Sequence, residues 1–346
     1  MGYELDAYKM SMMTSIVGLF TAAAVIGVCG VLMTIRAEHL ARTTGLGQAI
    51  MGAMFIGAST SLSGLVTSGS AAWAGHASLA VSNGLGGIAA QTMFLALADI
   101  VYRKANLEHA AASEVNLQQN ALLIVMLSMP LLALSVPELA IGWIHPISLL
   151  LVAAYLSGVY LVHHAYEHPM WYPRLTRQTE REKRDGEHIH RGTYRDWAAF
   201  LVLAGIVAVA GWVIAECGIA LSRQAGLEES IVGGVFTSIS TSLPELVIAI
   251  TAVRRGALTL AVGNILGGNA FDVLFLSVSD ALYLDGSIYS AIGRDEILWT
   301  AVSLLLAGVL MMGLLRREKF GFGNIGFEST LVLAIYIAAL ITLIVV

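Results

Sequence analysis

The sequence predicts an all-α polytopic membrane protein with about ten transmembrane helices, arranged as two inverted five-helix repeats. Three observations lead to this prediction: the composition, the number of apolar segments and an internal repeat. Of the 346 residues, 57% are hydrophobic and only 12% are charged, whereas an ordinary soluble domain carries about 25% charged residues. The mean hydropathy of +0.76 is also typical of a chain that lies mostly in lipid.

Ten apolar segments approach the length of about 20 residues that an α-helix needs to cross a bilayer. The first follows MGYELDAYK, which has neither a basic start nor a small-residue cleavage site. We therefore expect a retained helix there and not a signal peptide. In chain order the predicted spans are 13–34, 47–71, 77–101, 119–138, 143–163, 197–221, 229–252, 257–283, 296–315 and 327–346.

The distribution of Lys and Arg predicts the orientation, because basic loops stay on the cytoplasmic side. Three basic residues, Lys9, Arg223 and Arg294, fall on one side of the predicted bundle. About 16 fall on the other side, and this side should be cytoplasmic. Both termini should then face away from the cytoplasm. The predicted cytoplasmic residues are Arg36, Arg42, Arg103, Lys104, the seven from Arg174 to Arg195, Arg254, Arg255, Arg316, Arg317 and Lys319.

An internal repeat aligns residues 42–99 with residues 223–280 at an offset of 181 without a gap, with about 25 identities in 58 pairs. Each copy covers the second and third spans of a five-span half. Because five is odd, the two halves should cross the membrane in opposite directions, as in many secondary transporters. The identical pairs include Thr60/Thr241, Ser61/Ser242, Asn83/Asn264, Phe94/Phe275 and Asp99/Asp280; the last pair lies near helix ends, where we expect interfacial positions and not ligands.

The repeat and the charge pattern predict three parts of the chain. Residues 1–164 form the first five-helix half, residues 165–196 form a charged cytoplasmic linker, and residues 197–346 form the second half. The linker region contains a histidine group in which solvated side chains are a simpler interpretation than a metal site, because the spacing is not that of known metal ligands. This group comprises His163, His164, His168, His188 and His190.

The stretch GGVFTSISTSLPELVIAITAVRRGALTLAVGNILGGNAFDVLF, residues 233–275, closely resembles the second α-repeat of the calcium/cation antiporter superfamily, which includes the sodium/calcium exchangers. The shared pattern is a glycine-rich approach, then T-S-L-P-E, then G-N-x-x-G-S-N-x-x-(N/D) about twenty residues later. The resemblance implies an exchanger in which four α-repeat helices enclose cation sites at mid-membrane, beside helix breaks that expose carbonyl groups.

The resemblance assigns the central carboxylate to Glu245 and a second acid to Asp272. The physical chemistry agrees, because hard cations prefer oxygen ligands and a carboxylate in mid-span is costly without a function. Pro244 lacks an N–H and so frees carbonyl groups near residues 240 and 241. We expect Glu245 and Asp272 as metal ligands in a cation-binding set that also contains Thr241, Ser242, Asn264, Asn269, Thr60, Ser61 and Gln91.

The first repeat departs from the family pattern. Gly64 stands where a glutamate is expected, Ser63 stands where a proline is expected, and Gln91 falls opposite Asp272. In the second repeat, Gly268 replaces a serine that the family uses as a ligand. Both carboxylates therefore come from one half, and we expect the first half to act as scaffold and gate, with Gln91 as a neutral ligand.

These features predict a secondary-active cation antiporter that exchanges Ca²⁺ or another cation for Na⁺ or H⁺ by alternating access. A monovalent Na⁺(K⁺)/H⁺ antiporter is an alternative, favoured by the missing acid of the first repeat. A transport-inactive homologue that acts as a sensor or structural subunit is another. No enzyme or cofactor motif and no nucleic-acid partner are indicated. We expect the partners to be the lipid bilayer of the cell membrane and small inorganic cations. A homo-oligomer is compatible with the sequence.

Overall fold

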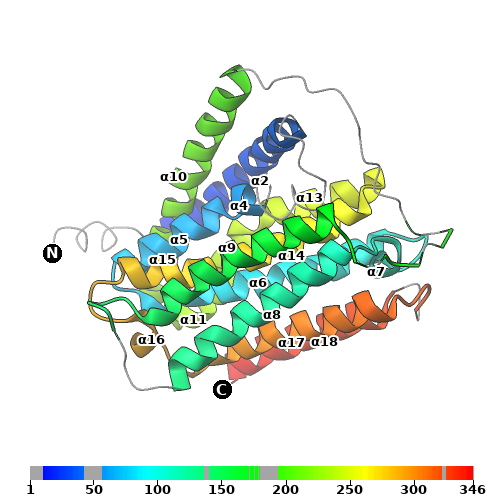
Figure 1. Cartoon of the computed structure of the whole chain (residues 1–346). Coiled ribbons are helices and arrows are strands. Elements are labelled where there is room, and N and C mark those ends of the chain that lie inside the picture. Colours follow the sequence, from blue (N-terminus) through cyan, green and yellow to red (C-terminus); the bar gives the residue numbers. More distant parts are fainter. Residues whose placement is uncertain are drawn as a thin grey trace.

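The computed structural model describes residues 11–42, 57–135, 140–170, 172–174, 176, 177, 179, 194–321 and 325–345, and helices dominate this part of the chain (Figure 1). The first half contains α2 (Met12–Arg42), α4 (Gly57–Thr60), α5 (Leu62–Trp73), α6 (Ala77–Val101), α7 (Leu107–Ala110), α8 (Glu114–Ser135) and α9 (Pro146–Glu167). The second half contains α10 (Tyr194–Ala225), α11 (Glu229–Ile231), the π-helix η2 (Val232–Thr237), α12 (Ser238–Thr241), α13 (Leu243–Arg255), α14 (Leu258–Asp272), α15 (Leu274–Leu282), α16 (Ile288–Ala291), α17 (Arg294–Arg316) and α18 (Phe327–Val345).

The predicted membrane-spanning fold is confirmed. Eight helical segments of the described chain are long and apolar enough to cross a bilayer, and the bent segment Glu229–Arg255 makes a ninth. The pair α4–α5 occupies the corresponding place in the first half, and the beginning of that predicted span, 47–56, lies outside the described residues. Most of the linker 165–196, with His188 and His190, also lies outside them, so the predicted division into halves stays a prediction.

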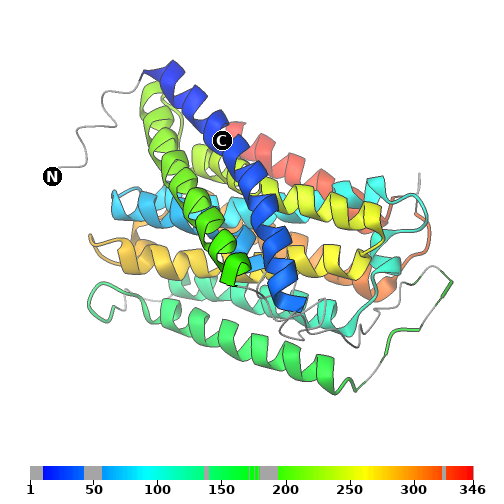
Figure 2. The ribbon, with the colours of Figure 1, turned by 90° about the horizontal axis from the view of Figure 1, so that it is seen from above.

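The two halves pack in the same way but run in opposite directions. In the first half, α6 leads toward α7, whereas α14 and α15 lead toward the opposite end of the bundle (Figure 1). The packing partners also correspond: α5 packs on α10 and α13 packs on α2, while α8 packs on α14 and α17 packs on α6. Figure 2 shows α2 and α10 side by side and inclined to the rest of the bundle. This is the inverted arrangement that the odd number of spans predicts.

The matched acids Asp99 and Asp280 bind backbone N–H groups in equivalent connections of the two halves. The backbone N–H of Leu107 donates to Asp99 Oδ1 (2.6 Å), and the N–H of Ile288 donates to Asp280 Oδ1 (2.9 Å). Each donor stands eight residues after its acid. The second oxygen of each carboxylate also accepts a backbone N–H, at 3.1 Å for Asp99 and at 2.7 Å for Asp280. In both cases the donor stands just before the fifth span of the other half. Both acids therefore anchor the connections between spans.

The second span of each half is broken at the same repeat position. In the second half the helix breaks at Ser242, between α12 and α13, and bends by 45°. In the first half it breaks at Ser61, between α4 and α5. Pro244 accounts for the second break, since it provides no N–H to the preceding turn. The first break forms without a proline.

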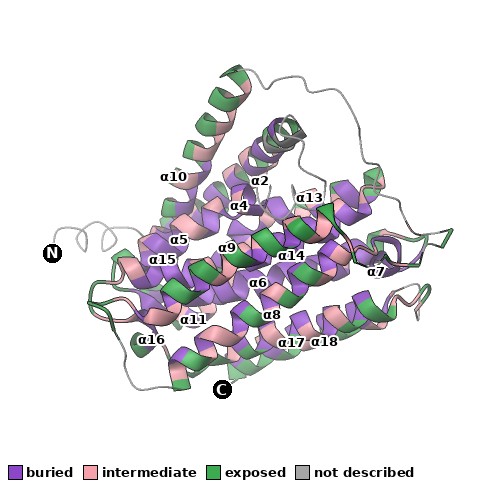
Figure 3. Ribbon diagram, in the orientation of Figure 1, coloured by how far each residue is buried: buried purple, intermediate pink, exposed green. Residues whose placement is uncertain are grey.

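Small residues let the inner helices approach closely at the centre of the bundle. A Cβ on Gly86 would lie 2.3 Å from the carbonyl oxygen of Gly234, and one on Gly233 would lie 2.6 Å from that of Leu79. Backbone-to-backbone packing of this kind is typical of membrane helix bundles. Figure 3 shows the result: α6 and α14 are largely buried, while the outer faces of α8, α9 and α10 are exposed.

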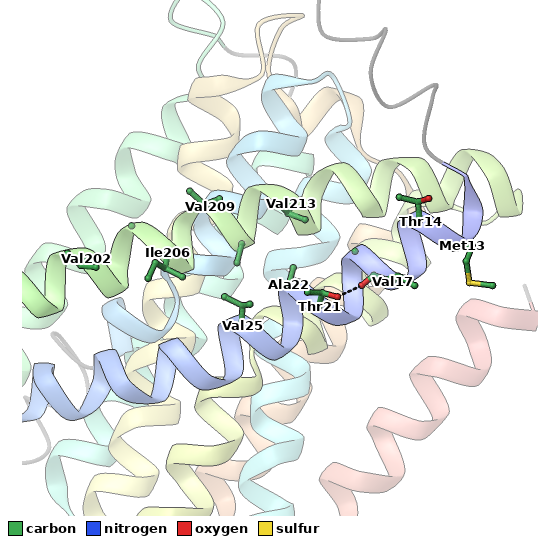
Figure 4. Close-up of a pocket in the computed structure, with 13 residues that line it drawn as sticks. Met13, Thr14, Val17, Thr21, Ala22, Val25, Val202, Ile206, Val209 and Val213 are labelled. Atoms are coloured by element: carbon green, nitrogen blue, oxygen red, sulfur yellow. Dashed lines mark hydrogen bonds between the residues drawn. The ribbon is translucent and has the colours of Figure 1, made fainter.

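The exposed faces are apolar, as a lipid-facing surface requires. Leu156 is 62% exposed and Val202 is 63% exposed. A groove of about 1000 Å³ separates part of α2 from part of α10 and is lined by residues such as Val17, Val25 and Val209 (Figure 4). Its lining contains no charged residue. This groove therefore suits lipid or another apolar molecule and not an ion.

Candidate cation site

Two buried carboxylates lie at interrupted helices of the second half. Glu245 stands in the first turn of α13, and Asp272 is the last residue of α14, directly before α15. Glu245 is 0% exposed and Asp272 is 1% exposed, and their carboxyl groups interact electrostatically. Both oxygens of Glu245 and Oδ1 of Asp272 lack a hydrogen-bond donor. Because an unpaired buried carboxylate is costly, this pair requires a cation or protons.

The first half brings neutral groups to the same place. Gln91 Nε2 donates to Asp272 Oδ2 (2.6 Å) and to Ser242 Oγ (3.2 Å). Gln91 Oε1 and Ser61 Oγ have no hydrogen-bond partner. They lie 3.3 Å and 3.9 Å from the position that a Cβ would occupy on Gly268. The glycine in place of the family's serine thus leaves space beside two free oxygens.

The two matched threonines bond their own helices. Thr60 Oγ1 donates to the carbonyl of Gly57 (2.9 Å), and Thr241 Oγ1 donates to the carbonyl of Ser238 (3.1 Å). Thr60 also lies beside the Glu245 carboxylate. Since its proton is directed to the helix, the lone pairs of Thr60 Oγ1 remain available to a cation.

The matched asparagines differ between the halves. Asn83 Nδ2 donates to Ser68 Oγ (2.9 Å), and its Oδ1 accepts from Thr237 Oγ1 (2.7 Å). Asn264 has no hydrogen-bond partner for Oδ1 or Nδ2. One reason is that Ala249 stands at the repeat position of Ser68 and offers no hydroxyl group. Asn83 is therefore a structural bridge, whereas the Asn264 amide stays free in the buried interior.

Asn269 faces the boundary between the two halves. Its Nδ2 donates to Thr92 Oγ1 on α6 (3.0 Å), and its Oδ1 has no partner. The amide is thus held by the first half with its oxygen left free. This is the arrangement expected of a neutral cation ligand whose orientation is fixed by its hydrogen bond to Thr92.

Sequence reasoning missed the hydrogen bond from Ser63 Oγ to the carbonyl oxygen of Thr241 (3.0 Å). Ser63 occupies the repeat position of Pro244. Ser63, which replaces the proline in the first half, therefore donates to a carbonyl at the helix break that Pro244 produces in the second half. The Thr241 carbonyl thus accepts a hydrogen bond from the first half, whereas the lone pairs of Thr241 Oγ1 stay available, as those of Thr60 Oγ1 do. The only sequence signal was a hydroxyl residue at the proline position.

Sequence reasoning also missed the role of Phe275. A Cβ on Gly64 would lie 2.7 Å from Phe275 Cε2 and 3.1 Å from Cζ. Real Cβ atoms do not approach other heavy atoms so closely, and the aromatic ring can yield only by moving in a packed interior. The ring therefore fills the space into which an acid at position 64 would project, and it makes the site one-sided.

The site has the chemistry of an oxygen-ligated cation site. Its acidic groups are two carboxylates, and its neutral oxygens come from hydroxyl and amide groups, which suit Ca²⁺, Na⁺ and similar hard ions. In the described part of the chain, no group of three or more His, Cys, Asp or Glu side chains is placed to hold a metal ion. In the linker region, His163 pairs with Glu167 (3.4 Å) and His164 contacts the ring of His168.

An α-helical bundle of two inverted halves around buried, unpaired carboxylates defines a membrane cation antiporter of the exchanger class. The chain belongs to the sodium/calcium exchanger protein family, whose sequence profile matches residues 14–163 and 196–345. Each of the two matched segments corresponds to one half of the chain. The predicted resemblance is confirmed.

Named relatives agree with this assignment. The putative antiporter CaxA of Alkalimonas amylolytica is 27% identical over 286 residues, which cover 81% of this chain and 85% of CaxA. The inner membrane protein YrbG of Escherichia coli is 32% identical over 161 residues, 44% of this chain and 49% of YrbG. The sodium/calcium exchanger MaX1 of Methanosarcina acetivorans is 24% identical over 157 residues, 45% of this chain and 43% of MaX1.

Solved structures share the fold. The H⁺/Ca²⁺ exchanger CAX matches with a TM-score of 0.70 and 16% identity, over 94% of this chain and 82% of CAX. The sodium-calcium exchanger NCX_Mj matches with a TM-score of 0.62 and 16% identity, over 96% of this chain and 99% of NCX_Mj. At this identity the likeness establishes the architecture of a multi-pass membrane protein, and the ion must be argued from the site.

Proposed function

We propose that the protein is a secondary-active antiporter that binds a cation between Glu245 and Asp272 and exchanges Ca²⁺ or another cation for Na⁺ or H⁺. The observation that carries this proposal is the set of carboxylate oxygens with no hydrogen-bond donor at two interrupted helices. Alternating access follows from the architecture, because inverted halves with a midplane site can open to either side in turn.

The two negative charges of the site favour one divalent ion, or monovalent ions that carry the same total charge. Glu245 and Asp272 together neutralise one Ca²⁺. Ca²⁺ takes 6–8 oxygen ligands, and Ser61, Gln91 and Asn269 each offer a free oxygen. Water or backbone carbonyls would complete the shell. Ligands from both halves would then be held by a single ion, which couples its binding to the relative position of the halves.

A monovalent Na⁺(K⁺)/H⁺ antiporter is the second candidate, and one observation favours it. The repeat position of Glu245 holds Gly64, and Phe275 fills the adjoining space. The first half therefore presents no acid to the cation. A one-sided ligand field of this kind satisfies Na⁺ or H⁺ with fewer oxygens than Ca²⁺ needs.

A flux assay on purified protein in proteoliposomes distinguishes the candidates, with Ca²⁺, Na⁺, K⁺ and pH gradients imposed in turn. Ca²⁺ uptake driven by a Na⁺ or pH gradient supports the leading proposal. Na⁺ or K⁺ flux against H⁺ without Ca²⁺ movement supports the monovalent antiporter. If no gradient drives any cation and no cation raises the melting temperature, the protein is a transport-inactive homologue.

The same proposal includes a place in the cell. The apolar outer faces support an integral protein of the cell membrane, and the excess of Lys and Arg on one side supports a cytoplasmic linker with both termini on the opposite side. At the linker end of the bundle, Arg317 contacts the beginning of the linker: its Nη1 donates to the carbonyl of Arg174 (2.8 Å).

A further inference from the structure

A second group of buried acids lies away from the cation site, at the linker end of the bundle. Glu108 on α7 is 2% exposed, Glu328 in the first turn of α18 is 1% exposed, and Asp99 at the end of α6 is 0% exposed. Asp99 is fully engaged by backbone N–H donors, as described above. Glu108 Oε2 and both oxygens of Glu328 have no donor.

The side chains of Glu108 and Glu328 contact each other. Two ionised carboxylates are acceptors only, so they cannot form a hydrogen bond with each other. Glu328 cannot turn away easily, because its Cγ lies 2.5 Å from the position that a Cβ would take on Gly313. A contact between two buried carboxyl groups is therefore stable only when one positive charge is added, and a shared proton is the smallest such charge.

Among the residues that the structure describes, the surrounding charges do not supply a counter-ion. The acids that face the pair are Asp99 and Glu318. Arg316 pairs with Glu318 (3.4 Å). Arg317 donates to the carbonyl oxygens of Arg174 and His109, and the nitrogens of His109 contact the Arg317 carbonyl and Thr176. Glu114 stands in the first turn of α8 and is not among the groups that interact with the pair.

A small gap in the packing lies at the same place. It has no room for a water molecule, and it is lined by Glu108, Glu328, Ser329 and Thr92 together with four apolar side chains. Ser329 is 1% exposed and lies beside the Asp99 carboxylate. Thr92 Oγ1 accepts the hydrogen bond from the Asn269 amide (3.0 Å). The gap therefore adjoins both the acid pair and Thr92, a residue that contacts Asn269 of the candidate cation site.

We propose that Glu108 and Glu328 form a second binding site, specific for a proton, in which the two carboxyl groups share one proton in a closely packed region beside Thr92. Burial and the charges of Asp99 and Glu328 raise the pKa of Glu108 well above its usual range, which agrees with a proton held at neutral pH. The site is separate from the cation site and does not depend on which ion is transported.

Infrared spectroscopy of the full-length protein in lipid tests the proposal by counting protonated carboxyl groups at pH 7. The variants are Glu108→Gln, Glu328→Gln and the double variant, with Glu114→Gln as the matched control. Glutamine resembles a protonated carboxyl group in shape, so we expect these variants to fold. Each single variant should lose at most one protonated carboxyl signal, because the wild-type pair holds one proton.

The double variant should lose the same single signal and no more, and the control should lose none. Loss of no signal in the double variant would show that both acids are ionised, and loss of two signals in the double variant would show two separate protons; either result overturns the proposal. The measurement is repeated with added Na⁺ and with added Ca²⁺. If either ion removes the signal at constant pH in Glu245→Gln protein, the pair is a metal cation site instead.

Thermal unfolding gives an independent readout. A carboxyl group whose pKa is raised in the folded state contributes stability at low pH, and this contribution is lost as the pH rises through the raised value. The melting temperature of the wild type should therefore fall as the pH rises above neutrality, and that of Glu328→Gln should fall less. An equal decrease in both proteins would contradict the shared proton.

Discussion

Gln91 and Asp272 occupy the same position in the two repeats and bind each other directly: Gln91 Nε2 donates to Asp272 Oδ2 at 2.6 Å. Residues related by an inverted repeat can meet in this way only close to the axis that relates the two halves. The contact therefore places the candidate cation site at the interface between the halves. It also explains how one acid can suffice at this position, because the amide donor balances part of the negative charge.

We expect Glu245→Gln to abolish cation flux. The substitution keeps the shape of the side chain but removes the carboxylate that has no other partner, so the cation loses its principal charged ligand. Flux of radiolabelled or fluorescently detected ions into proteoliposomes measures the effect. Glu216→Gln, a half-buried glutamate on α10, is the control and should retain flux. Full activity in Glu245→Gln would refute the proposed site.

Phe275 should determine whether a first-half acid can be restored. Gly64→Glu alone should reduce the yield of folded protein, because the new side chain meets the ring of Phe275. In Gly64→Glu/Phe275→Ala the acid has space, and Ca²⁺ binding should strengthen at least about tenfold relative to Phe275→Ala, since one more carboxylate faces the ion. Calorimetric titration with Ca²⁺ and Na⁺ measures both affinities. Unchanged Ca²⁺ affinity would show that position 64 does not face the cation.

Ser63→Ala should destabilise the contact between the two broken helices. The change leaves the carbonyl of Thr241 without its 3.0 Å donor, and a buried acceptor without a donor costs about 1–3 kcal/mol. A lower melting temperature in detergent is the expected result. Ser70→Ala, a half-buried serine of the same helix, is the matched control and should change it little. Equal melting temperatures for the two variants would show that the Ser63 bond contributes nothing to stability.

Cation binding should weaken as the pH falls. Protons and cations compete for Glu245 and Asp272, because a buried carboxylate without a cation takes up a proton. The apparent KM for the transported cation should therefore rise toward acidic pH. Asp272→Asn removes one competing proton, so its KM should depend less steeply on pH. A pH-independent KM in the wild type would exclude competition at these carboxylates.

The termini should lie outside the cytoplasm. A cysteine added after Val346 should react with a membrane-impermeant maleimide in intact cells, whereas Gly186→Cys in the linker should react only after lysis. The native Cys217 is buried and Cys29 is half-buried, so both should contribute little background. Labelling of Gly186→Cys in intact cells would invert the predicted topology.

A large part of the fold could be predicted because its signals are local. Long apolar segments, the offset of 181 residues and the odd number of spans are properties of the chain itself, and they predicted the helical bundle and its inverted halves. The special chemistry of Glu245 and Asp272 was also visible, since a buried acid in an apolar span is costly wherever the helix packs. Both acids lie buried at interrupted helices, as their motifs predicted.

The contacts between the halves were decided by tertiary structure alone. The sequence by itself determined that Gly64 lacks an acid and Ser63 lacks a proline, but it contained no indication that Phe275 fills the first space or that Ser63 binds the Thr241 carbonyl. Such contacts depend on how each helix is rotated and how closely it approaches its neighbour. Close-packed interiors set these quantities to within a fraction of an ångström through side chains that lie far apart in the chain.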